Sequence, residues 1–182
     1  RLHTLADKPM VIDDAGFEAL VRAFSVAREN EVLLYDIMTE RHEITTLLQR
    51  EFSTIAPLFG GLLRGSAEHP AVTKESVHYF SKLVSGVPLK RPPWYFDTTQ
   101  QGEGLVDITT HLVDLVQWEC FPGEALDYRI DVQIASARRW PTAITPEQFA
   151  HVTQLDAYPA YLRKDVQADG KLHTYANGEI DY

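Results

Sequence analysis

Three scarcities in this sequence exclude several classes of protein. Cys120 is the one cysteine among 182 residues, so the chain can form no internal disulfide and no cysteine-rich zinc or iron–sulfur site. No stretch approaches the ~18 consecutive apolar residues of a membrane-spanning helix, which argues against a membrane partner. Lysine and arginine together number 17 against 26 acidic residues, and the resulting net charge of −9 disfavours nucleic acid as a partner.

The sequence also lacks a dinucleotide-binding turn and a secretion signal. There is no Gly-x-Gly-x-x-Gly turn, the element that cradles the pyrophosphate of a dinucleotide. The first residues carry no secretion signal, and with the single cysteine this favours a cytoplasmic location. Arg1 is not a natural start, however, so a targeting segment upstream remains open. Residues 2–5 read as the end of a strand, and residues 179–182 as the start of one, so we expect a fragment of a longer protein.

Apolar residues make up 45% of the sequence, which is enough for a sizeable hydrophobic core. Periodicity and turn signals predict helices at 13–30, 42–59, 104–119 and 145–155, strands at 32–37, 72–84 and 128–134, and a loop or edge strand at 86–93. The strand at 128–134 shows the clearest alternation of apolar and polar residues, and Asn177-Gly178 predicts a hairpin turn. The order of elements predicts an α+β fold with a mainly antiparallel open sheet and helices packed on one face.

The helix at 104–119 carries the most unusual polar face. Leu105, Ile108, Leu112, Leu115 and Val116 form an ordinary core stripe. At 100° per residue, Asp107, His111, Asp114 and Trp118 fall within a sector of about 60°. A histidine bracketed by carboxylates suits a general acid or base. A polar face that only contacts solvent would show the same spacing. Asp107 and His111 could also bind a metal ion, but no third ligand follows at a recognisable spacing in the sequence. We therefore predict no metal.

A second candidate lies at the end of the first strand, in Asp7-Lys8-Pro9. A lysine at the carboxyl edge of a parallel sheet is placed where α/β proteins bind ligands, and the following proline restrains the backbone. Most lysines before a proline are simply exposed, so the tripeptide by itself is a weak signal.

Together, Asp7-Lys8-Pro9 and the stretch from Gly102 to Asp114 with its Asp-x-x-x-His spacing resemble the glucose-fructose oxidoreductase and inositol dehydrogenase family. In that family a Glu-Lys-Pro motif closes the nucleotide-binding domain, and a glycine-led helix of the second domain carries Asp-x-x-x-His. Asp7 replaces the usual glutamate and keeps its charge. Residues 139–142 and 175–179 look like a subgroup of oxidoreductases with a distinct C-terminal domain.

The resemblance implies a domain plan. Residues 1–12 would be the end of a truncated Rossmann domain. Residues 13–182 would be a C-terminal substrate-binding and oligomerisation domain, like that of dihydrodipicolinate reductase and itself cut short. A dinucleotide-binding domain of about 100 to 150 residues would lie upstream. The implied cofactor is NAD or NADP, the implied substrate a sugar or polyol, and the implied partner another copy of the chain joined through the sheet.

The resemblance also assigns roles to three residues. Lys8 would hydrogen-bond the reacting hydroxyl and, with Pro9, help to place the nicotinamide. His111 would take the proton as hydride leaves carbon, and Asp107 would bind substrate and orient the site.

Three further residues are candidates for substrate binding. Arg41 follows a strand end, Trp94 lies in a proline-rich loop that could stack on a sugar, and Asp114 shares the helix face of His111. Two other functions stay open: a non-catalytic module that dimerises through the strand at 128–134, and a metal-assisted hydrolase or isomerase using Asp107 and His111. Neither explains why the lysine motif and the Asp-x-x-x-His helix occur in this order.

Overall fold

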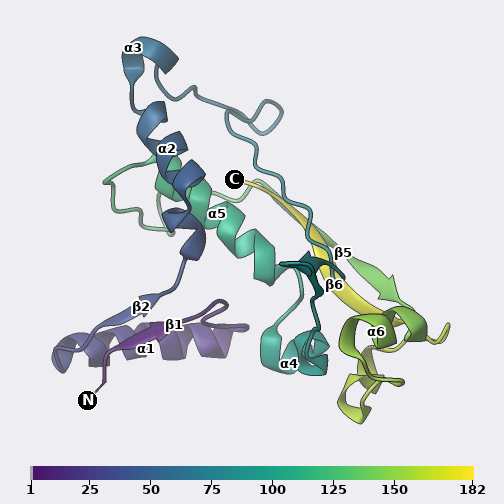
Figure 1. The fold of residues 1–182 in the computed structure, drawn as a ribbon. Coiled ribbons are helices and arrows are strands. Elements are labelled where there is room, and N and C mark those ends of the chain that lie inside the picture. The colour runs from purple at the N-terminus through teal and green to yellow at the C-terminus, as the bar shows by residue number, and fades with distance from the viewer. Residues whose placement is uncertain (1) are drawn as a thin grey trace.

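The computed structural model of the protein describes residues 2–182 and shows a mixed helix-and-sheet fold (Figure 1). In chain order the elements are β1 (Thr4–Ala6), α1 (Asp14–Glu29), β2 (Leu34–Asp36), the 3-10 helix η1 (Thr39–His42), α2 (Ile44–Ser53), α3 (Ala56–Phe59), β3 (Leu83–Val84), β4 (Val87–Pro88), η2 (Pro93–Phe96), α4 (Thr98–Gln101), α5 (Val106–Cys120), β5 (Ser136–Ile144), α6 (Pro146–Thr153), η3 (Ala160–Asp165) and β6 (Leu172–Asp181). Among the described residues the strands form three two-stranded sheets. The predicted mixture of helix and sheet is confirmed, but a single open sheet is not what these residues form.

The first three elements form a parallel β-α-β unit. Strand β1 pairs with β2 in the register Thr4 to Leu34 and Ala6 to Asp36, and α1 connects the two. The carboxylate of Asp13 caps α1 by accepting a hydrogen bond from the backbone nitrogen of Gly16, as its position before the apolar repeat predicts. This unit carries Lys8 just beyond the carboxyl end of β1.

The helix predicted over 42–59 is interrupted. Helix α2 begins after Glu43, whose carboxylate accepts from the backbone nitrogens of Thr45 and Thr46, and it ends at Ser53. Pro57 then occupies the first turn of a separate helix, α3. In one continuous helix Pro57 would have no N–H to donate to the Ser53 carbonyl, and its ring would crowd that carbonyl, so the chain starts a new helix with the proline in its first turn. Gly60, with φ of 74°, ends α3 as predicted.

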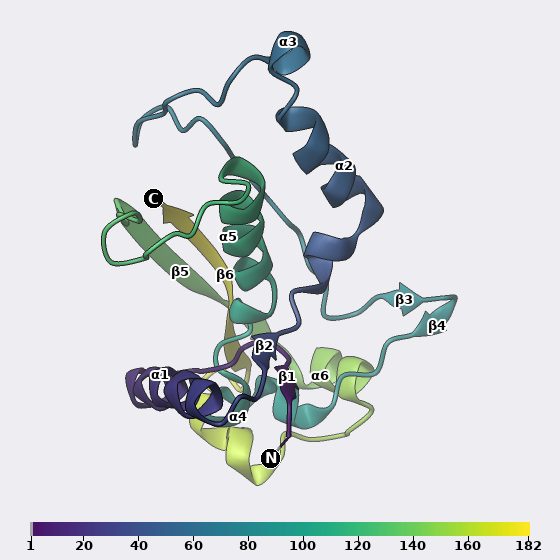
Figure 2. The same cartoon turned by 90° about the vertical axis from the view of Figure 1, so that its left-hand side faces the viewer.

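Helix α5 confirms the prediction for 104–119, and it lies between α2 and the ribbon of β5 and β6 in both views (Figures 1 and 2). Of its predicted core stripe, Leu115 is buried, whereas the other four residues are only half-buried. They line a hollow of about 1630 Å³ between α5, the β5–β6 ribbon and the segment at 62–78. Asp107, His111 and Asp114 do not line it, so the polar face of α5 points elsewhere.

The strand predicted at 128–134 is wrong, because residues 128–131 form a turn. The carboxylate of Asp127 accepts from the backbone nitrogen and Nε of Arg129, and the carboxylate of Asp131 accepts from the backbone nitrogen of Asp127. Such local hydrogen bonds compete with a strand ladder. Tyr128 and Ile130 stay 60% and 81% exposed, so the alternating pattern buries neither face.

The long antiparallel pair instead joins β5 to β6. Asn177 and Gly178 lie inside β6, opposite Trp140 and Arg139, so the predicted hairpin turn is also wrong. The register shifts between Trp140 and Pro141, where proline has no N–H for the ladder. Asn177 donates from Nδ2 to the Trp140 carbonyl at 3.2 Å, so its side chain bonds across the ribbon rather than shaping a turn.

The strand predicted at 72–84 is reduced to the two residues of β3. These pair with β4 around Ser85 and Gly86, which both have positive φ, and the rest of the segment has no strand partner. The segment at 86–93, predicted as a loop or edge strand, contains the short strand β4 followed by loop, and its last residue, Pro93, begins η2. Apolar and β-branched content over 72–82 was misleading, because no described strand pairs with these residues.

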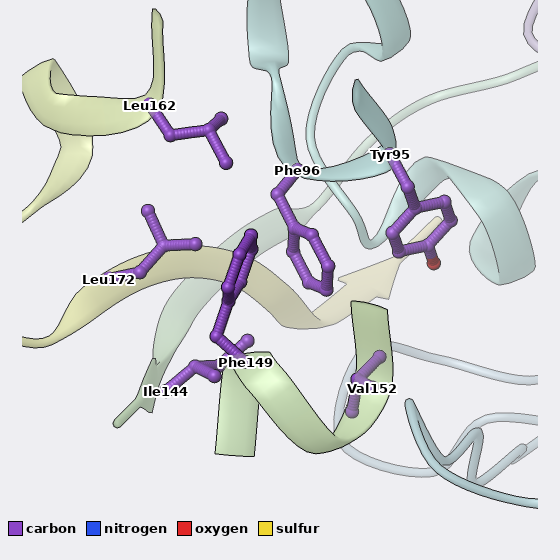
Figure 3. Close-up of a cluster of buried hydrophobic side chains, with 7 residues drawn as sticks. All are labelled: Tyr95, Phe96, Ile144, Phe149, Val152, Leu162 and Leu172. Carbon is purple, nitrogen blue, oxygen red and sulfur yellow. The ribbon is translucent and has the colours of Figure 1, made fainter. Parts of the chain in front are cut away.

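The best-packed core joins α6, η2, η3 and the start of β6. Phe149, Leu162 and Leu172 are 0% exposed and contact Phe96, Tyr95, Ile144 and Val152 (Figure 3). Helix α6 begins at Thr145, which forms a reciprocal capping box with Gln148, and this confirms the helix predicted from Thr145-Pro146-Glu147. The core therefore anchors η2, the short helix that carries Tyr95. In the part of the chain that the structure describes, no helix is long and apolar enough to cross a membrane.

Candidate functional site

Lys8 and Asp107, the two residues singled out from separate motifs, meet in the folded chain. The Nζ atom of Lys8 donates to Oδ1 of Asp107 at 2.8 Å, across 99 positions of sequence. The two side chains are 18% and 16% exposed, so the ion pair is largely shielded from water but still reachable from outside. This contact joins the carboxyl end of β1 to the first turn of α5.

A third residue, Tyr95, completes this cluster through a contact that the sequence did not indicate. The hydroxyl of Tyr95 donates to Oδ2 of Asp107 at 3.2 Å, so each carboxylate oxygen of Asp107 has its own donor. The guanidinium of Arg91 lies over the Tyr95 ring, 4.5 Å from its centroid, and its Nη2 lies 2.7 Å from Nε2 of His78. Proline-rich sequence around Tyr95 favoured a loop, and no spacing rule connects it to Asp107.

The surroundings shift the pKa values of both Tyr95 and Asp107. Burial raises the pKa of Tyr95 to about 12, and the negative charge of Asp107 acts in the same direction. Burial also works against ionisation of Asp107, but the hydrogen bond and charge of Lys8, with the hydrogen bond from Tyr95, hold the pKa of this carboxyl below its ordinary value. Asp107 is therefore a carboxylate, and Tyr95 a neutral donor, at physiological pH.

Arg41 and Asp114, both predicted to bind substrate, form an ion pair with each other in the folded chain. Nε of Arg41 donates to Oδ2 of Asp114 at 2.7 Å, and Nη2 makes a second contact with Oδ1. The hydrogen bond to Asp114 raises the pKa of Arg41, although burial opposes it. This two-point contact ties η1, just after β2, to the middle of α5 and leaves little of either charge unpaired.

His111 lies between these two ion pairs on the same helix. Its Nδ1 atom is buried and has no hydrogen-bond partner among the residues that the structure describes. We expected Asp107 and Asp114 to bracket the imidazole, but their oxygens are engaged by Lys8, Tyr95 and Arg41. In the described part of the chain, His111 is thus left with a buried nitrogen that has no partner, between two carboxylates that are each paired with a cation.

The other candidates lie as follows. Trp94 is 47% exposed, and Trp118 packs under the guanidinium of Arg50 at 4.3 Å. Pro9 follows Lys8 through a cis peptide bond. Within residues 2–182 no three side chains of histidine, cysteine, aspartate or glutamate converge as metal ligands would.

Comparison with known proteins identifies similar chains. Residues 48–182 match a family model described as "Putative oxidoreductase C terminal domain". The crystal structure of a putative oxidoreductase from Parabacteroides merdae ATCC 43184 is 56% identical, with a TM-score of 0.91 over 98% of this chain. The chain spans 40% of the length of that protein's chain. A search of curated proteins found no match.

Proposed function

Because the chain belongs to the family of oxidoreductase C-terminal domains that its residues 48–182 match, we propose that it forms the substrate side of an NAD(P)-dependent oxidoreductase. The reaction would move a hydride between nicotinamide and a sugar or polyol hydroxyl, as in glucose-fructose oxidoreductase and inositol dehydrogenase. One observation carries this proposal: Lys8, at the end of a parallel strand, reaches the first carboxylate of the Asp-x-x-x-His helix at 2.8 Å.

The residues present suit one end of a dinucleotide. Lys8 and Pro9 lie at the carboxyl edge of the β1–β2 pair, the edge where α/β folds bind ligands. The unused Nδ1 of His111 is a polar atom without a partner in the described residues. No glycine-rich phosphate turn occurs in the sequence, so these residues would contact the nicotinamide end and not the pyrophosphate. The nicotinamide supplies the hydride acceptor when bound.

The chain's own residues would handle the proton and the developing charge. The ammonium of Lys8 would donate a hydrogen bond to the reacting hydroxyl and stabilise negative charge on that oxygen. His111 would accept the hydroxyl proton as the carbon loses hydride. Asp107 would hold Lys8 in place through its Oδ1. Arg41 and Asp114, paired with each other, would border the substrate rather than bind its charge.

Exposed apolar surface on the β1-α1-β2 unit supports a further domain. Leu5 and Tyr35 are 67% and 56% exposed, and Phe17, Val21 and Phe24 on α1 are each more than 40% exposed. Parallel sheets are ordinarily covered on both faces, so we propose that the unit completes a larger Rossmann sheet. Since β1 and β2 pair, we place the domain boundary after Asp36 and not between residues 12 and 13.

The rival of a dimerising module has lost its main support, because the residues at 128–134 form a turn and loop. A homo-oligomer joined through the β5–β6 ribbon remains a proposal.

The test is cofactor-linked turnover by the full-length protein. We expect NAD⁺ or NADP⁺ to be reduced in the presence of myo-inositol, D-glucose or a related polyol. Lys8→Met and His111→Ala should each lower kcat about 100-fold or more. Lys171→Met removes an exposed lysine that pairs with Asp169, and it should leave kcat unchanged. If the wild-type protein binds neither cofactor and oxidises no sugar or polyol, the proposal is refuted.

A further inference from the structure

We propose that Tyr95 is a positioning residue of this site, which fixes the Asp107 carboxylate from the side opposite Lys8. The proposal deepens the proposed function and rests on it. Asp107 receives Lys8 on Oδ1 at 2.8 Å and the Tyr95 hydroxyl on Oδ2 at 3.2 Å. A carboxylate held at one oxygen can rotate about its last bond, whereas one held at both oxygens cannot. Tyr95 would therefore determine where Asp107 presents the Lys8 ammonium.

The tyrosine is itself held rigidly. The residue is 8% exposed and belongs to the core cluster shown in Figure 3. The ring meets Phe96 and Phe80 edge to face, with centroids 5.3 Å and 6.3 Å away. The backbone nitrogen of Tyr95 donates to the Pro92 carbonyl at 3.0 Å, which closes the turn of η2. The hydroxyl therefore reaches Asp107 from a fixed base, which is what a positioning group needs.

Arg91 and His78 support the ring from outside the core. The Arg91 guanidinium covers the ring face and contacts Nε2 of His78, while its backbone nitrogen donates to the Val152 carbonyl at 2.9 Å. Burial, then the charges of Lys82 and Arg91, lower the pKa of His78. His78 therefore accepts from Arg91 as a neutral imidazole, and the cation stays over the tyrosine.

The charged and titratable groups facing Asp107 come from separate parts of the chain. Lys8 follows β1, and His78 lies in the segment before β3. Arg91 lies just before η2, and Tyr95 lies within it. Lys8 and Arg91 contribute positive charge, and Tyr95 contributes a hydrogen bond without charge. Removing the Tyr95 hydroxyl therefore deletes one donor and leaves the charges in place.

The first variant is Tyr95→Phe in the full-length protein, with Tyr161→Phe as its matched control. Tyr161 is 43% exposed and lies in η3. The primary measurement is the titration of Asp107 by carboxyl ¹³C NMR, with Asp107→Asn identifying the resonance. We expect the pKa of Asp107 to rise in Tyr95→Phe and to stay at the wild-type value in Tyr161→Phe. An unchanged titration in Tyr95→Phe overturns the proposal.

A second variant guards against loss of folding in the first. Replacing Tyr95 with 3-fluorotyrosine keeps the ring and makes the hydroxyl a stronger donor, so the pKa of Asp107 should fall. A rise or no change would contradict the proposal. Because this titration needs no substrate, it decides the role of Tyr95 even if the proposed reaction is wrong.

Measurements of kcat and KM then distinguish a positioning role of Tyr95 from a contribution to stability alone. In Tyr95→Phe we expect kcat to fall about tenfold with little change in KM, as for loss of a hydrogen bond to a charged group. The acid limb of the pH profile should also move to higher pH, which a stability defect would not cause. If Lys8→Met abolishes turnover while Tyr95→Phe has wild-type kcat and pH profile, the proposed function stands and the role of Tyr95 fails.

Discussion

Glu119 near the end of α5 offers a test of how the fold treats a buried charge. The side chain is 8% exposed, and its Oε2 accepts from Nζ of Lys74 at 2.7 Å and from Nε2 of Gln49 at 2.9 Å. Its Oε1 is buried without a partner in the described residues. The contact ties α2 and the segment before β3 to α5, and we predict that Lys74→Met weakens this junction strongly.

The magnitude follows from two opposing terms. At 2.7 Å and an effective dielectric constant of about 20, the attraction between Lys74 and Glu119 is roughly 6 kcal/mol. Burying the ammonium of Lys74 offsets part of this, because its side chain is only 18% exposed. Removing Lys74 leaves the carboxylate buried with a single donor. We expect the free energy of local opening at the α2–α5 junction to fall by about 3 kcal/mol.

The assay is hydrogen exchange with mass spectrometry on the full-length protein, read on peptides from α2 and α5. Arg138→Met is the matched control, because Arg138 and Glu179 form a pair that is 71% and 45% exposed and should contribute less than about 0.5 kcal/mol. The double variant Lys74→Met with Glu119→Met should recover most of the loss, since no charge is then left unpaired. Equal effects of Lys74→Met and Arg138→Met, or no recovery in the double variant, would refute the reasoning.

Two further predictions concern the core and the site. Phe149→Ala should destabilise the α6 core by about 3 to 5 kcal/mol in urea unfolding, because Phe149 is 0% exposed, whereas Phe121→Ala, at a residue 38% exposed, should change it much less. Comparable losses would contradict the packing shown in Figure 3. The lowered pKa of Asp107 means that its ionised form stabilises the folded state fully above the carboxyl's ordinary pKa, and that this contribution is lost as pH falls through the lower pKa of the folded state. Asp107→Asn should therefore flatten the loss of stability in acid, and an unchanged acid melting profile would count against the ion pair.

Local signals in the sequence predicted most helices well. Asp13 before an apolar repeat, and Thr145 before a proline, define helix starts because a side-chain oxygen can satisfy the first free backbone nitrogens. Gly60 likewise marks a helix end. These interactions span a few residues, so sequence alone contains them.

Strands were predicted less well, because a strand depends on what lies beside it. The alternation at 128–134 resembles a half-buried strand, yet hydrogen bonds around Asp127 fold it into a turn. Asn177 and Gly178 have the composition of a hairpin turn but lie within β6, where pairing with β5 outweighs their local preference.

The candidate site divides in the same way. The sequence by itself determined that Asp107, His111 and Asp114 share one helix face, because helical geometry fixes residues three and four apart. Only the tertiary structure decided that Lys8 pairs with Asp107, that Arg41 pairs with Asp114, and that Nδ1 of His111 has no partner among residues 2–182. The hydrogen bond from Tyr95 to Asp107 could not be predicted from the sequence, because it depends on the packing of η2 against the core and not on spacing along the chain.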